Sequence, residues 1–115
     1  MSDDCLFCKI IAGEIPATEV YRDDDVFAFE DINPTAPTHT LVIPIKHLKD
    51  IAAAAEEDAE LLGKLMLAAN KIAAEKGLSE GGFRYVINTG RHGGQTVFHL
   101  HLHIIGGRQM TWPPG

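Results

Sequence analysis

Residues 99–105 read His-Leu-His-Leu-His-Ile-Ile, and this alternation of histidine with apolar residues constrains the fold more than any other segment. Side chains of a β-strand point to opposite faces in turn, so the three histidines share one face and the apolar residues cover the other. Neighbours on one face lie about 6.6 Å apart, close enough for two imidazoles to contact one small group. The segment therefore predicts a strand with one core face and one face of clustered imidazoles.

A cluster of imidazoles is typical of a chemical site. Each positive ring disfavours protonation of its neighbours, which lowers their pKa values and keeps at least one ring neutral and nucleophilic near pH 7. Two alternatives stay open at this point. One is a row of ordinary surface histidines on a half-exposed strand. The other is a metal centre, because a His-x-His pair on a strand can chelate zinc with a third histidine nearby.

Length and composition limit the class of protein. With 115 residues, 45% of them hydrophobic and 23% charged, the chain predicts one globular domain over residues 1–115. The net charge of -6 argues against a nucleic-acid partner, since such proteins need a basic surface, but it leaves a single nucleotide as a ligand. No secretory signal and no apolar run of ~20 residues is present, which predicts no membrane association and a cytoplasmic location. Cysteines in that compartment are reduced.

The remaining sequence predicts short elements separated by turn signals. Gly13 and Gly77 are stop signals for two helices, and an acidic first turn at the start of the longer helix is expected to be solvated. The expected elements are a helix over 5–12, a hairpin of strands 18–22 and 26–30, a strand over 39–44, an amphipathic helix over 55–76, a strand over 83–88 and a glycine-rich loop over 89–95. Together with the histidine strand they predict an α+β fold with an antiparallel sheet of about five strands, one long helix and a short N-terminal helix.

The motif at residues 99–105 matches the His-φ-His-φ-His-φ-φ signature of the histidine triad (HIT) superfamily, where φ is apolar. The resemblance covers nearly the whole chain, through the segments 9–11, 14–16, 36–39, 93–95 and 106–115. The chain resembles most the histidine triad nucleotide-binding proteins, which are purine nucleoside phosphoramidases. The resemblance implies a single HIT domain that cleaves the P–N bond between a purine nucleoside 5′-phosphate and an amine, with no organic cofactor.

The same resemblance implies the catalytic residues. His101 is the expected nucleophile, which attacks the α-phosphorus and forms a nucleotidyl-histidine intermediate that water then cleaves. His103 is expected to bind the phosphoryl oxygens and assist proton transfer, and His39 to support the imidazole cluster. Thr96 matches a hydroxyl, often a serine in relatives, that hydrogen-bonds the leaving group or the phosphate.

The resemblance also implies substrate-binding residues and a partner. The expected contacts to the purine nucleotide come from Asp31 to the ribose, Ile32 to the purine, Asn88 to ribose and phosphate, Gly94 and Gln95 to the phosphate region, and Trp112 to the amine side of the substrate. In relatives the segment equivalent to that around Trp112 reaches the active site of a second subunit, which implies a homodimer. From the residues alone, Asp31 is an ordinary loop cap. The glycine pair lets backbone N–H groups approach a phosphate closely, but such a pair is at least as common in a hairpin loop.

Cys5 and Cys8 form a C-x2-C pair, which a helix can also place on one face merely for packing. Similarity to bacterial-type triad proteins implies that His47 and His99 complete a structural zinc site with these cysteines, and thiolate and imidazole ligands suit zinc. Reduced, metal-free cysteines are the alternative. If His99 belongs to this site, it cannot also serve a catalytic centre of three histidines.

Three other functions stay open. Dinucleoside polyphosphate hydrolases and nucleotidyl transferases belong to the same superfamily, but those branches commonly carry glutamine in place of the third histidine, here His103. The chain could also be a nucleotide-binding interaction module, which the complete set of predicted catalytic residues disfavours.

Overall fold

The computed structural model describes residues 4–115, and residues 1–3 lie outside the described part. The chain forms α1 (Leu6–Ile11), β1 (Glu19–Arg22), β2 (Val26–Glu30), β3 (Thr38–Pro44), two short 3-10 turns (Ile51–Ala53 and Glu56–Asp58), α2 (Ala59–Glu75), β4 (Phe83–Val86) and β5 (Leu102–Gly106). The strands make one sheet in the order β1-β2-β3-β5-β4, and every neighbouring pair is antiparallel. This architecture confirms the predicted α+β fold.

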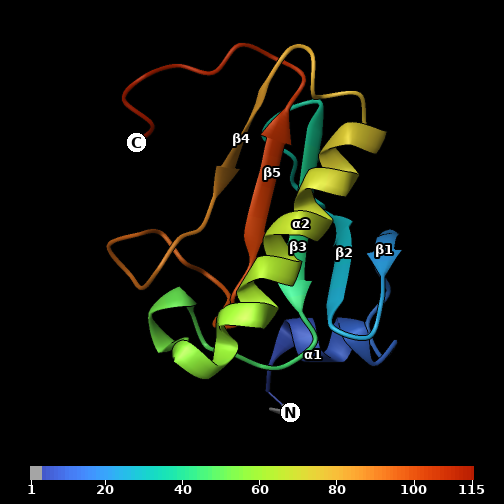
Figure 1. Cartoon of the computed structure of the whole chain (residues 1–115), viewed down its shortest axis with the longest axis vertical. Coiled ribbons are helices and arrows are strands. Elements are labelled where there is room, and N and C mark those ends of the chain that lie inside the picture. Colours follow the sequence, from blue (N-terminus) through green and yellow to red (C-terminus); the bar gives the residue numbers. More distant parts are fainter. Residues whose placement is uncertain (1–3) are drawn as a thin grey trace.

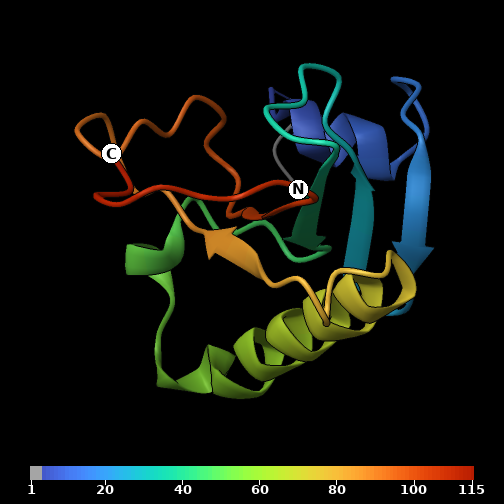
Figure 2. The ribbon, with the colours of Figure 1, turned by 90° about the horizontal axis from the view of Figure 1, so that it is seen from above.

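The sheet separates the two helices. The long helix α2 runs along one face and the short helix α1 lies on the other, so both faces of β2 and β3 are covered (Figures 1 and 2). On the α2 side, Leu65 and Ile72 pack with strand residues such as Val42. On the α1 side, Phe7 packs edge-on against Phe29 with ring centroids 5.3 Å apart. Each central strand therefore buries both of its faces.

The histidine segment divides its side chains between these two sides. Leu100, Leu102 and Ile104 are fully buried in the α2 core. His99 and His101 lie on the α1 side, where their ring centroids are 6.0 and 5.1 Å from that of Phe7. The alternation predicted from the sequence thus holds in space.

The predicted extent of the histidine strand was wrong. β5 begins only at Leu102, so His99 and His101 lie in the segment that precedes the strand. The pairing of β3 with β5 places Val42 opposite Leu102, and two positions further along the ladder Pro44, which has no N–H, would lie opposite Leu100. The Leu100 N–H donates instead to the Leu48 carbonyl at 2.7 Å, which ends the ladder.

The long helix also begins later than predicted, at Ala59, after a 3-10 turn over 56–58. The acidic residues 56–58 that precede the helix are only partly solvated, because Asp58 is buried. The Asp58 carboxylate accepts hydrogen bonds from Lys46 Nζ at 2.8 Å and from the Ala55 N–H at 2.9 Å, and the Lys46 ammonium lowers the pKa of Asp58. The helix ends at Glu75, and the predicted stop signal Gly77 follows two residues later with a φ of +76°, a left-handed conformation that favours glycine.

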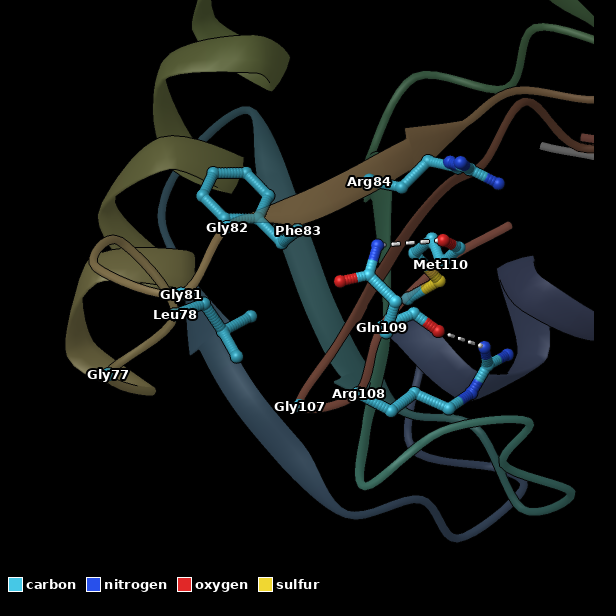
Figure 3. A pocket seen from close by; sticks show the side chains of 10 residues that line it. All are labelled: Gly77, Leu78, Gly81, Gly82, Phe83, Arg84, Gly107, Arg108, Gln109 and Met110. Atoms are coloured by element: carbon cyan, nitrogen blue, oxygen red, sulfur yellow. Dashed lines mark hydrogen bonds between the residues drawn. The ribbon is translucent and has the colours of Figure 1, made fainter. Parts of the chain in front are cut away.

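A hollow of about 500 Å³ lies beside β4, between the turn after α2 and the segment after β5 (Figure 3). Its charged lining residues are Arg84 and Arg108, and both guanidinium groups are bonded to main-chain carbonyls, those of Thr111 at 2.9 Å and Thr35 at 3.1 Å. Among residues 4–115, no histidine, cysteine or acidic side chain lines it. This hollow therefore offers no reactive group. Within residues 4–115, no helix is long and apolar enough to cross a membrane.

Candidate functional site

A cavity of about 260 Å³ lies on the α1 side of the sheet, and His101 and His103 line it. Most of its wall is apolar, and a few polar groups meet at one part of it, which is typical of sites for small molecules. The polar lining residues are Glu30, Asp31, Thr96, His101 and His103. The apolar lining residues are Leu6, Phe7, Ile10, Ile15, Pro16, Ala17, Phe29, Ile32, Leu41 and Val97.

His101 has one ring nitrogen fixed by the backbone. Its Nδ1 lies 2.7 Å from the carbonyl oxygen of His99, and because a carbonyl can only accept, Nδ1 carries the proton. Burial lowers the pKa of His101, although the hydrogen bond to the carbonyl opposes this effect. The ring is therefore neutral near pH 7 and has its lone pair on Nε2, the arrangement that a nucleophilic imidazole requires.

The protonation of His103 is set by a chain of hydrogen bonds that starts at the backbone. The Thr35 N–H donates to Nδ1 of His39 at 3.1 Å, so Nε2 of His39 carries the proton. That Nε2 lies 2.8 Å from Nδ1 of His103, which accepts, so the proton of His103 is on Nε2. Burial lowers the pKa of His103 to about 4, with the neighbouring His101 and His39 rings adding to the shift. His103 is thus a neutral N–H donor beside His101, with ring centroids 5.0 Å apart.

Nε2 of His103 is a buried polar atom with no hydrogen-bond partner among residues 4–115. An unpaired buried donor of this kind costs free energy, roughly 1–3 kcal/mol, unless something accepts its hydrogen bond. Because His103 lines the cavity, a bound oxygen atom is the natural acceptor. This observation marks the histidine end of the cavity as a binding site for an oxyanion or another acceptor group.

Asp31 and Ile32 stand at the same cavity. One carboxylate oxygen of Asp31 accepts the Asn33 N–H at 2.8 Å, the loop-capping role, while the other lies 3.4 Å from Nε2 of His39. The Ile32 side chain is 89% exposed, so it offers apolar surface without a protein partner. Asp31 therefore caps the loop, as its position in the sequence predicts, and also lies beside His39.

The structure does not bring every sequence-predicted residue to this cavity. Asn88, Gly94, Gln95 and Trp112 are absent from its lining, and Trp112 is 81% exposed in its own chain. The amide of Gln95 is used within the structure. It accepts the Gly90 N–H at 2.9 Å and donates to the carbonyls of Lys49 and Val97 at 2.9 and 3.0 Å. Its side chain thus holds the glycine-rich loop in place.

Sequence reasoning missed the apolar wall, above all Phe7, Leu6 and Val97. Phe7 lies between the two cysteines on α1, and its ring touches the rings of His99 and His101. The alternation in β2 and β3 could have identified Phe29 and Leu41 as residues on one face of the sheet. Nothing in the sequence pattern indicates which helix covers that face.

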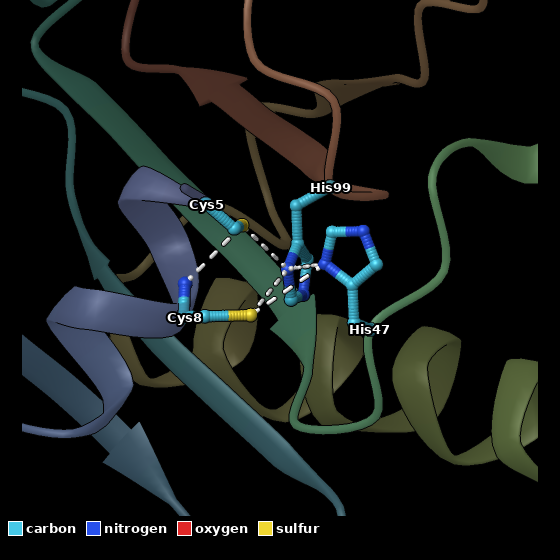
Figure 4. A group of neighbouring side chains, drawn as sticks. All are labelled: Cys5, Cys8, His47 and His99. Atoms are coloured by element: carbon cyan, nitrogen blue, oxygen red, sulfur yellow. Dashed lines mark hydrogen bonds between the residues drawn. The ribbon is translucent and has the colours of Figure 1, made fainter. Parts of the chain in front are cut away.

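Cys5, Cys8, His47 and His99 meet at one point, next to the cavity (Figure 4). Nδ1 of His99 lies 3.3 Å from Sγ of Cys5 and 3.6 Å from Sγ of Cys8. Nδ1 of His47 lies 3.5 Å from Sγ of Cys8 and 3.1 Å from Nδ1 of His99. The potential ligand atoms of all four residues lie within 4.8 Å of one another.

This donor set fits zinc. A tetrahedron with zinc bonds of about 2.05 Å to nitrogen and 2.3 Å to sulfur has edges of about 3.3 Å between nitrogens and about 3.5 Å from nitrogen to sulfur. The distances within the cluster are close to these values. His99 donates from Nε2 to the Pro44 carbonyl at 2.8 Å, which directs the lone pair of Nδ1 toward the cysteines, and burial lowers its pKa to about 4. The four residues form a closed site suited to a structural zinc.

Asp31, His39 and His103 form a second group with metal-ligand spacing. For His39 to bind a metal through Nε2, its proton would have to move to Nδ1, which accepts the Thr35 N–H. The Nδ1–H of His39 and the Thr35 N–H would then both be donors and would face each other. His99 cannot join a catalytic centre of three histidines either, since both of its ring nitrogens face the cysteine cluster or Pro44. The geometry thus disfavours a catalytic metal at the histidine cavity.

Known proteins share the sequence and fold over nearly the whole chain. The HIT domain family model matches residues 12–110. An uncharacterized HIT-like protein of Synechocystis is 56% identical over 115 residues, 100% of both chains. The 14 kDa zinc-binding protein of Zea mays is 54% identical and covers 96% of this chain and 87% of its own. The crystal structure of a HIT family hydrolase from Legionella pneumophila has a TM-score of 0.96 at 55% identity, covering 97% of this chain and 100% of that one.

Proposed function

Because the chain belongs to the HIT domain family, we propose that it is a hydrolase that cleaves the P–N bond of purine nucleoside 5′-phosphoramidates through a nucleotidyl-histidine intermediate. The observation that carries this proposal is the pair of fixed tautomers in the cavity. His101 has a free lone pair on Nε2, and His103 beside it has a free N–H on Nε2. A nucleophile next to a donor for the phosphoryl oxygen is what attack on phosphorus requires.

The proposed reaction has two displacements. Nε2 of His101 attacks the α-phosphorus and forms an N–P bond while the P–N bond to the amine breaks. The amine leaves with the electron pair of the broken bond and takes a proton from solvent, while the Thr96 hydroxyl and His103 hydrogen-bond the reacting groups. A water molecule then attacks the same phosphorus and breaks the bond to His101, whose Nε2 regains its lone pair. The attacking water loses a proton to solvent, and the nucleoside monophosphate is released. His103 donates its Nε2 hydrogen to the charged oxygens in both steps.

The remaining contacts follow the shape of a nucleotide. A carboxylate can accept from two hydroxyls, so Asp31 is the proposed ribose ligand, with the purine against Ile32 and the apolar wall. Asn88, Gly94 and Gln95 lie outside the cavity lining. We therefore propose that any phosphate contact from 94–95 comes from the backbone, because the Gln95 amide is already bonded. The resemblance also underlies a proposed homodimer, in which Trp112 reaches the partner's site. A cytoplasmic location is a separate proposal.

The zinc site has a structural role in this proposal. Zinc bound by Cys5, Cys8, His47 and His99 would hold α1 and the start of the histidine segment together. If zinc were instead the catalyst, a chelator would abolish turnover at once. A structural zinc predicts that chelation first lowers the melting temperature.

The experiment that tests the proposal compares wild type with His101→Ala on adenosine 5′-phosphoramidate. Wild type is expected to release AMP, and the variant to release none above background. A quenched wild-type reaction should contain a peptide with AMP attached to His101. The melting temperature and zinc content of the variant serve as the folding control. Equal turnover by both proteins would refute the mechanism.

The same assay separates the alternative functions. A dinucleoside polyphosphate hydrolase would cleave diadenosine tetraphosphate faster than the phosphoramidate. An interaction module would bind AMP without cleaving either compound. Gel filtration with light scattering tests the homodimer.

A further inference from the structure

The proton positions of two cavity histidines depend on one contact from the loop before β3. The Thr35 N–H donates to Nδ1 of His39 at 3.1 Å, and Nε2 of His39 lies 2.8 Å from Nδ1 of His103. The Thr35 hydroxyl lies 3.4 Å from the same Nδ1, but a hydroxyl can donate or accept and therefore selects neither tautomer. A backbone N–H can only donate. The Thr35 N–H therefore gives this hydrogen-bond chain its direction.

The opposite direction of the chain would also leave both rings neutral. If the proton of His39 moved to Nδ1, its Nε2 would become an acceptor, and His103 would have to donate from its own Nδ1. Nε2 of His103 would then carry a lone pair in place of a hydrogen. In the proposed reaction this nitrogen donates to the charged phosphoryl oxygens, which a lone pair would repel. The placement of Thr35 thus separates a productive arrangement from an unproductive one.

Arg108, in the segment after β5, holds Thr35 by its carbonyl. Nε and Nη2 of Arg108 lie 3.2 and 3.1 Å from the Thr35 carbonyl oxygen, so two charged donors bind one acceptor, and Nη1 donates to the Gln109 carbonyl at 3.3 Å. The preceding residue packs on the same loop, since a Cβ on Gly107 would lie 2.8 Å from Cβ of Pro37. Arg108 lines the hollow beside β4 (Figure 3) and is absent from the lining of the histidine cavity.

Asp31 favours the same direction of the chain while the cavity is empty. Its Oδ2 lies 3.4 Å from Nε2 of His39, and a carboxylate attracts a proton to that nitrogen. In the proposed function this carboxylate accepts hydrogen bonds from the ribose instead. The contact from Thr35 then has to hold the tautomer of His39, so the loop matters most when a nucleotide is bound.

We propose that Arg108 is a positioning residue of the histidine site. By binding the Thr35 carbonyl, it keeps the Thr35 N–H directed at Nδ1 of His39. The hydrogen-bond chain then keeps a hydrogen on Nε2 of His103, where the phosphoryl oxygen accepts it. This inference rests on the proposed function, which gives that hydrogen its role. The contribution of Arg108 therefore falls on the chemical step more than on nucleotide binding.

The first test measures turnover of adenosine 5′-phosphoramidate by wild type, Arg108→Ala and Arg108→Lys. Arg108→Ala should lower kcat by ~3–10-fold and change KM by less than ~2-fold, because the lost hydrogen bonds support an arrangement used in the transition state. Arg108→Lys keeps one charged donor and should recover part of the loss. Arg22→Ala is the matched control, since the Arg22 guanidinium also donates to a main-chain carbonyl, that of Ile11 at 3.3 Å, and it should keep the wild-type kcat.

The second test does not depend on turnover. Nitrogen-15 NMR of protein labelled in its histidine rings, recorded at pH 7.5 with AMP, reports which nitrogen of each ring carries hydrogen. Wild type and Arg22→Ala should carry hydrogen on Nε2 of both His39 and His103. Arg108→Ala should show a fraction of molecules with hydrogen on Nδ1 of these rings. Melting temperatures show whether each variant is folded, and a loss of stability alone would not move these hydrogens.

The outcomes separate the two proposals. If wild type does not cleave the phosphoramidate, the proposed function fails, and the NMR comparison still tests whether Arg108 controls the proton positions. If wild type cleaves it but Arg108→Ala keeps both the wild-type kcat and the hydrogen on Nε2 of His103, the positioning role is wrong while the function stands. A lower kcat in Arg108→Ala with unchanged hydrogen positions would also overturn the positioning role.

Discussion

Replacing His103 by glutamine should weaken the dependence of stability on pH. Burial lowers the pKa of the folded-state ring to about 4, whereas the unfolded chain titrates near its ordinary value of 6.5. Between these values the unfolded state binds a proton that the folded state does not. The free energy of unfolding therefore falls as the pH decreases through 6.5, and His103 causes no further loss below about 4.

The size of this effect follows from the two pKa values. The whole shift corresponds to ~3 kcal/mol, of which ~2 kcal/mol falls between pH 7.5 and pH 5.0. The His103 ring is partly accessible to solvent, and screening reduces the expected contribution to ~1–2 kcal/mol. Wild type should therefore lose ~1–2 kcal/mol more than His103→Gln over this interval.

Urea denaturation followed by circular dichroism at pH 7.5, 6.0 and 5.0 measures the difference. The proposed zinc ligands are present in both proteins, so their own pH dependence cancels in the comparison. His92→Gln, at an exposed loop position, controls for the loss of a histidine and should retain the wild-type pH dependence. If His103→Gln loses as much stability as wild type between pH 7.5 and 5.0, the assignment of a neutral, partly buried His103 is wrong.

Three further substitutions test other parts of the structure. Gly93→Ala places a Cβ 2.5 Å from the backbone oxygen of Thr89, so the loop must shift. The free energy of unfolding, measured in urea titrations, should fall by ~1–3 kcal/mol. Unchanged stability would contradict the close packing of Gly93 against Thr89. Cys8→Ser should lower bound zinc, measured by plasma mass spectrometry, and the melting temperature together, and retained zinc would count against the ligand set. Leu102→Ala leaves a cavity in the core and should lower the free energy of unfolding by ~2–5 kcal/mol. Leu67→Ala, at an exposed position, should lower it by less than about 0.5 kcal/mol. Similar losses of stability in the two variants would show that Leu102 does not lie in the core.

The fold was largely predictable from the sequence because its elements have local signals. The alternation at residues 99–105 assigned Leu102 to the core and His103 to the other face, and both positions hold in the structure. Gly77 marked the end of α2 because its backbone conformation is one that glycine adopts readily. Signals of this kind depend on neighbouring residues and need no knowledge of the partner elements.

The errors have tertiary causes. β5 is shorter than predicted because of Pro44, which lies on another strand. Asp58 is buried because Lys46 approaches it from outside the helix. The sequence also could not show that the Gln95 amide faces the Lys49 and Val97 carbonyls. Each of these features depends on a residue distant in the sequence or on the path of a loop.

The residue types of the candidate site could be predicted from the sequence, but the ring nitrogen that carries the proton in each histidine could not. The resemblance implied roles for His39, His101 and His103, but only the structure shows that Thr35 N–H fixes the first link of their hydrogen-bond chain. The apolar wall of the cavity has no such signal, since Leu6 and Val97 line one space only after α1 has packed on the sheet.

His99 belongs to both sites of the molecule: its ring faces the cysteine cluster and its carbonyl oxygen holds the proton of His101. Binding events that share a rigid residue are thermodynamically linked, and such coupling is reciprocal. If zinc fixes the ring of His99 and thereby the orientation of His101, the proposed nucleophile, then zinc increases the affinity for a nucleotide that orders His101, and that nucleotide increases the affinity for zinc by the same factor. Substrate would then slow metal loss, and an idle protein would be the form most easily stripped of its metal.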